Sequence, residues 1–88
     1  MFEEEKKKVP VGKIAHFYGK ISVAVLDLSD TLKQGDQIVI EGHGKEVKQK
    51  VDSMQIEHQN VSVAKKGQSI GLRTVDVVKE GDLVFKLV

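Results

Sequence analysis

One short pattern occurs three times in this chain of 88 residues and constrains its fold more than any other feature. Each copy places a glycine two positions after a lysine: Lys33-Gln34-Gly35-Asp36, Lys65-Lys66-Gly67-Gln68 and Lys79-Glu80-Gly81-Asp82. Glycine at that position supplies the positive φ that a tight turn requires. An alternating apolar segment follows each turn, as Ile38 and Ile40 follow Gly35. Repeated turn-and-strand units in so short a chain predict a small all-β domain.

Length and composition restrict the class of protein. We expect a flexible charged leader at residues 1–8 and a single domain at residues 9–88. The sequence has no cysteine, which excludes disulfides and thiolate ligands. No stretch approaches the roughly 20 apolar residues that span a bilayer, and the acidic start does not resemble a secretory signal. We therefore expect a cytoplasmic protein without membrane contact.

Apolar alternation predicts six strands and three local irregularities. The mixed pattern near the start of the domain indicates a bulge or a strand covered on both faces. The alternation that begins at Ile21 changes phase near Asp27, which predicts a bend. A parity change between Val51 and Met54 predicts a bulge or sharp bend in the longest strand. The expected strands are residues 9–17, 21–28, 37–41, 46–58, 68–74 and 82–87.

We expect these strands to close into a six-stranded antiparallel β-barrel. No segment has a sustained 3.6-residue period, and no connection is long enough to contain a crossover helix. Residues 60–64 are expected to form an irregular excursion anchored by Val61 and Val63. Closure removes the exposed edges through which so small a sheet would aggregate.

The glycine spacing and strand order resemble those of a known family. The matching segments are residues 19–25 (GKISVAV), 32–40 (LKQGDQIVI), 67–73 (GQSIGLR) and 81–84 (GDLV). They resemble domain 2 of translational GTPases such as elongation factor Tu, and the resemblance covers nearly all of residues 10–88. It implies a β-barrel of the translation-factor type. It also implies tRNA, rRNA or a ribosome-associated protein as the partner.

The departures from that family are also informative. The sequence lacks a Gly-x-x-x-x-Gly-Lys-[Ser/Thr] motif, because Gly42-His43-Gly44-Lys45 has the wrong spacing and is followed by Glu46. We therefore expect no GTP binding and no cofactor. The family commonly has Arg-Gly-Thr where this chain has Lys20-Ile21-Ser22, which argues against an inherited contact with the aminoacyl end of tRNA. The chain is also similar to a barrel appended to collagenase-like peptidases, so the module does not identify a pathway.

We expect neither a catalytic nor a metal site. His16, His43 and His58 lack the spacing of a chelating motif. The serines show no nucleophile elbow with an adjacent base. Asp36 and Asp82 follow turn glycines, where carboxylates typically accept hydrogen bonds from nearby backbone N–H groups. The sequence therefore indicates that the chain is not an enzyme.

The candidate contact residues are basic. Lys48 and Lys50 have the parity opposite to Val47 and are expected to project from one outward face. Such cations would neutralise phosphates, whereas the alternative is a solvated face that prevents edge-to-edge pairing. Arg73, the only arginine, would hold a phosphate or carboxylate, or would form a structural ion pair. The candidate set is Lys45, Lys48, Lys50, Lys65, Lys66 and Arg73.

Two functions remain open from the sequence. The first is a non-catalytic β-barrel binding module that contacts RNA or the translation machinery through the six basic residues. The alternative is a protein-interaction or accessory subunit of an enzyme encoded elsewhere, such as a collagenase-like peptidase system. The net charge of +1 gives no global attraction for nucleic acid and favours a protein partner.

Overall fold

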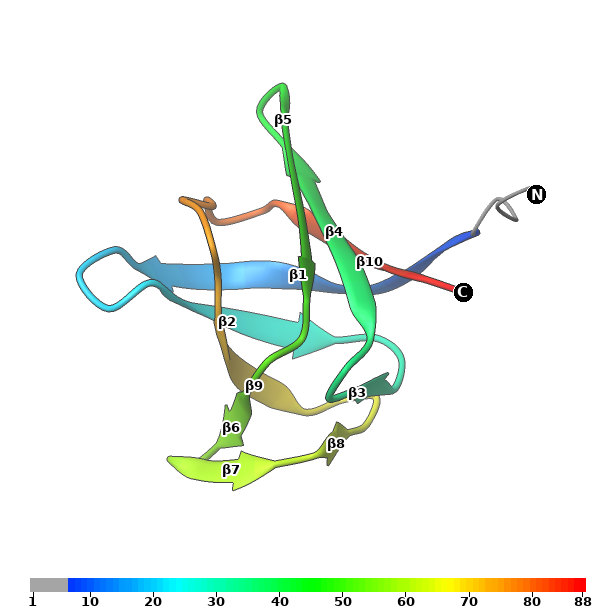
Figure 1. Ribbon diagram of the computed structural model, residues 1–88. Coiled ribbons are helices and arrows are strands. Elements are labelled where there is room, and N and C mark those ends of the chain that lie inside the picture. The colour runs from blue at the N-terminus through cyan, green and yellow to red at the C-terminus, as the bar shows by residue number, and fades with distance from the viewer. Residues whose placement is uncertain (1–6) are drawn as a thin grey trace.

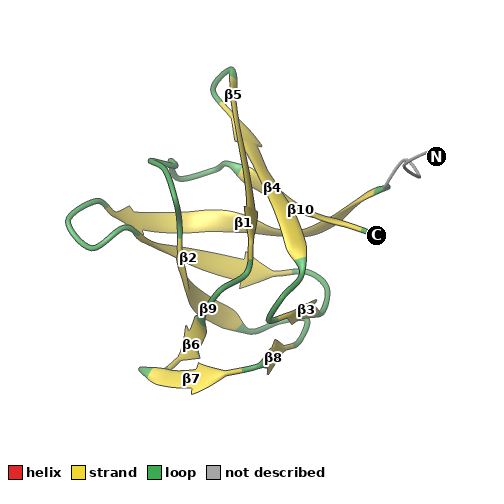
Figure 2. Cartoon of the chain, in the orientation of Figure 1, coloured by secondary structure: helices red, strands yellow, loops and turns green. Residues whose placement is uncertain are grey.

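Ten strands form the regular structure of residues 7–88, the part of the chain that the computed structural model describes (Figure 1 and Figure 2). The all-β class is therefore confirmed, and that part of the chain contains no helix that could span a membrane. The strands are β1 (Lys8–Tyr18), β2 (Val23–Leu28), β3 (Leu32–Lys33), β4 (Gln37–Gly42), β5 (Lys45–Lys50), β6 (Met54–Ile56), β7 (Gln59–Val61), β8 (Val63–Ala64), β9 (Ser69–Arg73) and β10 (Leu83–Leu87).

The first strand begins one residue before the predicted start of the domain. β1 starts at Lys8, and the backbones of Lys7 and Val88 exchange two hydrogen bonds of 2.9 Å. Residues 1–6 of the predicted leader lie outside the described residues.

The main sheet is antiparallel and open. Its order is β5-β4-β10-β1-β2-β9-β6-β7, while β3 and β8 pair separately. β5 and β7 stand at the two ends and do not pair with each other, so the prediction of a closed six-stranded barrel is wrong.

The reason for the open sheet lies between β5 and β6. Val51 donates its N–H to the Asp36 carbonyl and accepts from the Gly35 N–H, each at 2.8 Å. The chain then leaves β4, and β6 pairs with β9. The segment from Val51 to Ser53, rather than a ladder of hydrogen bonds, therefore connects β5 at one end of the sheet to β6 near the other end. The chain does change direction between Val51 and Met54 as predicted, but the single strand expected at residues 46–58 is wrong, because β5 ends at Lys50 and β6 begins at Met54.

The expected irregular excursion at residues 60–64 contains strand instead. Glu57 and His58 have φ values of 50° and 66°, and this two-residue turn joins β6 to β7. Positive φ at both central residues is the geometry of a type I′ hairpin. Ala64 on β8 is buried, whereas Val63 is 42% exposed, so Ala64 rather than Val63 is the anchor.

The three repeated turns have the predicted geometry. Gly35, Gly67 and Gly81 have φ values of 94°, 90° and 90°. The residue after each glycine donates its N–H to the lysine carbonyl at 3.0–3.1 Å, as in a type II turn. The side chain of that same residue accepts the lysine N–H: Asp36 at 2.9 Å, Gln68 at 2.7 Å and Asp82 at 2.9 Å. The expected role of Asp36 and Asp82 is thereby confirmed.

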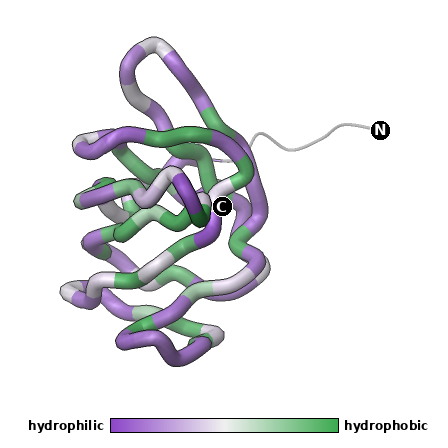
Figure 3. The backbone as a smooth tube through the Cα atoms, turned by 90° about the vertical axis from the view of Figure 1, so that its left-hand side faces the viewer, coloured by the Kyte–Doolittle hydropathy of each residue, from purple (hydrophilic) through white to green (hydrophobic). Residues whose placement is uncertain are grey.

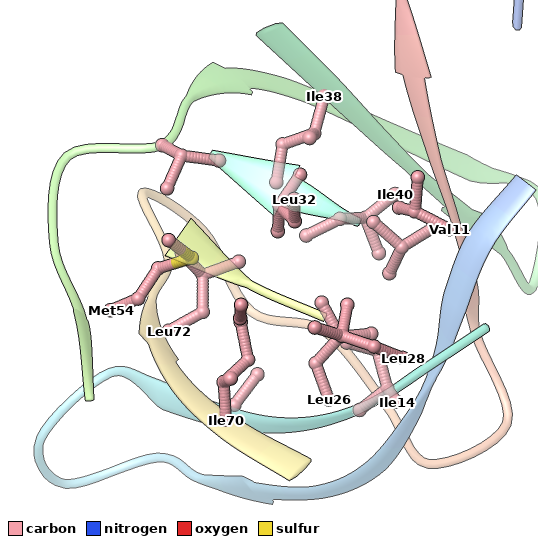
Figure 4. Close-up of a cluster of buried hydrophobic side chains, with 14 of the residues drawn as sticks. Val11, Ile14, Leu26, Leu28, Leu32, Ile38, Ile40, Met54, Ile70 and Leu72 are labelled. Atoms are coloured by element: carbon pink, nitrogen blue, oxygen red, sulfur yellow. The ribbon is translucent and has the colours of Figure 1, made fainter. Parts of the chain in front are cut away.

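The core lies inside the curved sheet, where the side chains of Leu32, Ile38 and Ile40 point toward those of Leu26 and Ile70 (Figure 4). Hydrophobic and hydrophilic positions alternate along the strands, as the hydropathy colouring shows (Figure 3). Each fully buried aliphatic side chain contributes about 1.5–3 kcal/mol relative to exposure.

The phase irregularities fall on β1 rather than on β2. The pairing of β2 with β9 is continuous from Val23 to Asp27, so the predicted bend near Asp27 is wrong. Ala24, Leu26 and Leu28 face the core, and β2 needs no phase change to present them. β1 instead shifts register at 10–12 and at 14–16, which confirms a bulge in the first strand.

Candidate functional site

The six basic residues predicted to contact a partner lie on three elements. β5 stands at one end of the main sheet and does not pair with β8 or β9, whose connecting turn carries Lys65 and Lys66. The Arg73 carbonyl accepts a hydrogen bond from Gln49 Nε2 at 2.9 Å, which places the end of β9 beside β5. Arg73 therefore lies near β5, whereas Lys48 and Lys50 have the opposite parity to Gln49 and no hydrogen bond or ion pair within residues 7–88 joins them to Arg73. The positions are Lys45, Lys48 and Lys50 on β5, Lys65 and Lys66 in the β8–β9 turn, and Arg73 at the end of β9.

Two of the β5 lysines have carboxylate partners. Lys45 Nζ donates to Asp76 Oδ1 at 2.9 Å, and Lys48 Nζ lies 3.7 Å from Glu46 Oε1. The hydrogen bond from Lys45, assisted by the Val77 N–H, holds the pKa of Asp76 below its ordinary value of 3.8. Part of the predicted cationic face is thus neutralised. The contact role of the six residues stays a prediction.

The segment that follows β9 runs beside β5 and is held there by side chains. The Gln49 carboxamide donates to the Arg73 carbonyl and accepts the Val75 N–H, both at 2.9 Å. Lys45 Nζ adds a hydrogen bond to the Val77 carbonyl at 3.1 Å. These contacts fix residues 73–77 against the edge strand of the sheet.

Thr74 fixes the same segment from its other side. This threonine is 4% exposed, and its N–H donates to the Ser22 carbonyl at 2.8 Å. Its hydroxyl donates to the Asp76 carbonyl at 2.8 Å. Residues 73–77 are therefore held between β5 and the turn that joins β1 to β2.

Two exposed apolar residues lie side by side where these two segments meet. Val23 pairs with Arg73, and the Thr74–Ser22 hydrogen bond continues that pairing, so Ile21 and Val75 lie at adjacent positions. In Figure 1 the β1–β2 turn projects at the left, with the orange segment after β9 above it. We call the four exposed apolar residues of these two adjoining segments the tip cluster: Tyr18 (50% exposed), Ile21 (59%), Val75 (73%) and Val77 (56%).

The β1–β2 turn that presents the tip cluster is ordered by its own contacts. The Ile21 N–H lies 3.3 Å from the Tyr18 carbonyl, and Ser22 takes a φ of 55°, which is uncommon for a residue with a side chain. The Tyr18 ring packs edge-on against the His16 ring at 4.4 Å between centroids. The His16 ring is in turn 3.3 Å from a Glu80 carboxylate oxygen. The apolar groups are thus displayed on a defined backbone.

Two cations border the tip cluster. Lys20 lies in the turn beside Ile21, and Arg73 lies two residues before Val75. Within residues 7–88 the structure gives neither side chain an ion pair, whereas Asp76 is bound to Lys45. Glu80 also borders the cluster, beside the His16 ring that packs on Tyr18, so the cations without an ion pair lie on the side of Lys20 and Arg73.

The tip cluster was not predicted, because Ile21 was expected to begin a strand at residues 21–28, whereas β2 begins at Val23. A signal was present in the sequence, since Val75 and Val77 lie outside every predicted strand.

The histidines do not converge. His43 Nδ1 lies 2.9 Å from Asp82 Oδ1, and His16 contacts Glu80. No group of three histidine, aspartate or glutamate side chains within residues 7–88 is arranged to hold a metal ion.

Comparisons with known proteins identify relatives of this chain, although no family model matches it. An uncharacterized protease of Methanocaldococcus jannaschii is 43% identical over 82 residues, which cover 92% of this chain and 20% of that protein. A collagenase of Porphyromonas gingivalis is 34% identical over 83 residues, with the same two coverages of 92% and 20%. The chain thus spans about a fifth of the length of the curated relatives it matches.

Solved structures show the fold. The C-terminal domain of a putative U32 peptidase from Geobacillus thermoleovorans superimposes with a TM-score of 0.82 at 13% identity, covering 96% of this chain and all of that one. A second crystal structure of that domain gives a TM-score of 0.81 at 13% identity, covering 86% and 89%. The chain therefore has the fold of this peptidase domain.

These matches correct three expectations. The assignment to domain 2 of translational GTPases is wrong, because the relatives in sequence and the matching structures are peptidases. The expected translation and RNA-binding role is wrong with it. The expectation that the protein is not an enzyme is overturned by relatives named as a protease and a collagenase. Of the two functions left open by the sequence, the matches support the link to a collagenase-like peptidase.

Proposed function

We propose that this chain is the accessory domain of a collagenase-like peptidase of the U32 type and acts by contacting protein. The observation that supports the proposal is the 43% identity over 82 residues to a protease of which those residues make up 20%. A domain that recurs within a larger protease is expected to serve its proteolytic task.

The structure contributes a second argument. A protein-contacting domain needs apolar side chains that are exposed yet held in place, since ordering them on binding costs free energy. The tip cluster meets this requirement, because the segments that bear Ile21 and Val75 are joined by the Thr74–Ser22 hydrogen bond.

A segment exchange tests the proposed function. The Porphyromonas gingivalis collagenase would be prepared intact, without its matching 83 residues, and with this chain in their place. We expect deletion to abolish most hydrolysis of gelatin and the exchange to restore it. An unrelated β-domain of similar length, inserted at the same place, is the control and should not restore hydrolysis.

Two results would contradict the proposal. One is full activity after deletion, which would show that the segment has no part in proteolysis. The other is a folded exchange protein, monitored by circular dichroism and gel filtration, that remains as inactive as the deletion.

A further inference from the structure

We propose that the tip cluster binds unfolded segments of the protein substrate in which an apolar side chain is flanked by carboxylates. The inference rests on the proposed function, because a peptidase is what supplies a polypeptide substrate. Its starting observation is that most of the exposed large apolar residues of the described chain lie on two adjoining segments. Four of the seven large hydrophobic residues that are exposed within the described chain belong to the tip cluster. The other three, Val63, Leu83 and Val88, lie on β8, on β10 and beyond β10.

The tip cluster is prepared for binding before a ligand arrives. Gln49 and Thr74 hold the backbone on both sides of Val75, and the Ile21 turn is joined to that segment through Ser22. Fixed apolar side chains lose little conformational freedom on binding, so more of the free energy of burial appears as affinity.

Charge selects the class of ligand. Lys20 and Arg73 lie beside the tip cluster and form no ion pair among residues 7–88. The nearby carboxylate of Asp76 is already paired with Lys45 and does not neutralise them. The Arg73 guanidinium is suited to bidentate recognition of a carboxylate. A bound segment therefore needs acidic residues next to its apolar one.

The tip cluster lies far from the described ends of the chain. Lys7 and Val88, the first and last described residues, pair through their backbones at the other end of the molecule (Figure 1).

Peptide binding tests this site. Three fluorescent peptides of about ten residues would be titrated into the full chain with anisotropy as the readout. One has a Leu-Phe centre flanked by acidic residues, one has the same centre flanked by lysines, and one has a serine centre flanked by acidic residues. We expect clear binding of the first peptide alone. The Ile21→Ser, Val75→Ser double variant should weaken it by about tenfold, because two half-buried aliphatic contacts are lost.

Matched variants locate the site and its charge. Val63→Ser alters another exposed valine and should leave the affinity unchanged. Lys20→Glu should weaken binding, whereas Lys66→Glu, in the β8–β9 turn, should not. Equal binding of all three peptides, no binding of the acidic apolar peptide, or an equal loss in Val63→Ser would overturn the inference.

Two further outcomes separate this inference from its alternatives. If sedimentation shows a dimer that the double variant converts to monomer, a second copy occupies the tip cluster and the inference is wrong. If the segment exchange restores gelatin hydrolysis but no peptide binds, the site is wrong and the proposed function stands. Peptide binding without restored hydrolysis would support the site and contradict the proposed function.

Discussion

Glycine has two distinct physical roles in this chain. At Gly35, Gly67 and Gly81 the space around an added Cβ is open, and the constraint is the positive φ of the turn. At Gly12 the constraint is close packing, because a Cβ would lie 2.4 Å from the Asp27 carbonyl oxygen of β2. Gly42 is similar, since its Cβ would lie 2.1 Å from Asp82 Oδ1. In the first role glycine permits a positive φ, and in the second its lack of a Cβ permits two elements to pack closely.

The two roles predict different costs of substitution. Gly35→Ala should lower the free energy of unfolding by about 1–2 kcal/mol, the cost of a left-handed conformation at a residue with a side chain. Gly12→Ala should cost more, because β1 and β2 must separate to accept the methyl group. Urea unfolding monitored by circular dichroism measures both. An equal or smaller loss in Gly12→Ala would contradict the close approach.

At the scale of elements, the contact between β5 and residues 73–77 depends on side chains. Gln49 supplies a donor and an acceptor, and Lys45 supplies a charged donor. An edge strand would otherwise offer unpaired backbone groups to other chains. Residues 73–77 therefore lie along the edge strand β5, and the same hydrogen bonds hold Val75 and Val77 of the tip cluster in place.

Acid should release one part of this contact. Because Lys45 lowers the folded-state pKa of Asp76 below 3.8, the pair stabilises the fold above that pH and loses its effect as pH falls through the lowered pKa. The Val77 N–H, which donates to Asp76 Oδ1 at 2.7 Å, reports this titration by NMR. We expect a midpoint below 3.8 that rises toward 3.8 in Lys45→Met. An unchanged midpoint in that variant would show that Lys45 is not the cause.

Gln49 offers a finer test, because its carboxamide both donates and accepts. Gln49→Glu keeps an acceptor for the Val75 N–H but removes the donor to the Arg73 carbonyl. Gln49→Ala removes both. We expect amide exchange at Val75 to accelerate strongly in Gln49→Ala and less in Gln49→Glu, each lost hydrogen bond being worth about 1 kcal/mol. Equal exchange in both variants would mean that the acceptor makes no contribution.

Local signals in the sequence were sufficient for elements whose geometry is local. The three lysine–glycine turns were predicted because glycine marks a positive φ, and the bend after Val51 because apolar parity changes there. The Glu57-His58 turn was missed, since neither residue indicates a positive φ. The open sheet was missed because the pairing of Val51 with Asp36 is a tertiary contact that no local pattern reports.

The candidate site shows the same limit. Sequence spacing located the lysines of β5, but it did not indicate that Asp76 would bind Lys45. The tip cluster joins residues 18–21 to residues 75–77, which are more than fifty positions apart in the sequence. Only the register of β2 against β9, in which Val23 pairs with Arg73, brings them together.

For the whole molecule, the described ends of the chain lie far from the proposed binding site. The described ends of the chain meet at one end of the sheet, and the tip cluster lies at the other (Figure 1). In a peptidase of about five times this length, such a domain would hold substrate while the catalytic portion cleaves it. A domain of this kind affects the hydrolysis of long substrates more than that of short ones, because a short peptide does not reach both sites.

The measurement that tests this account most directly is therefore a comparison of two substrates. The exchange protein, in which this chain replaces the matching residues of the Porphyromonas gingivalis collagenase, would be assayed on gelatin and on a short peptide cleaved at the same active site, with and without Ile21→Ser and Val75→Ser. We predict that the two substitutions lower kcat/KM for gelatin by about tenfold, the loss of two half-buried aliphatic contacts, and leave the short peptide unaffected. Equal losses on both substrates, or no loss on gelatin, would contradict the account.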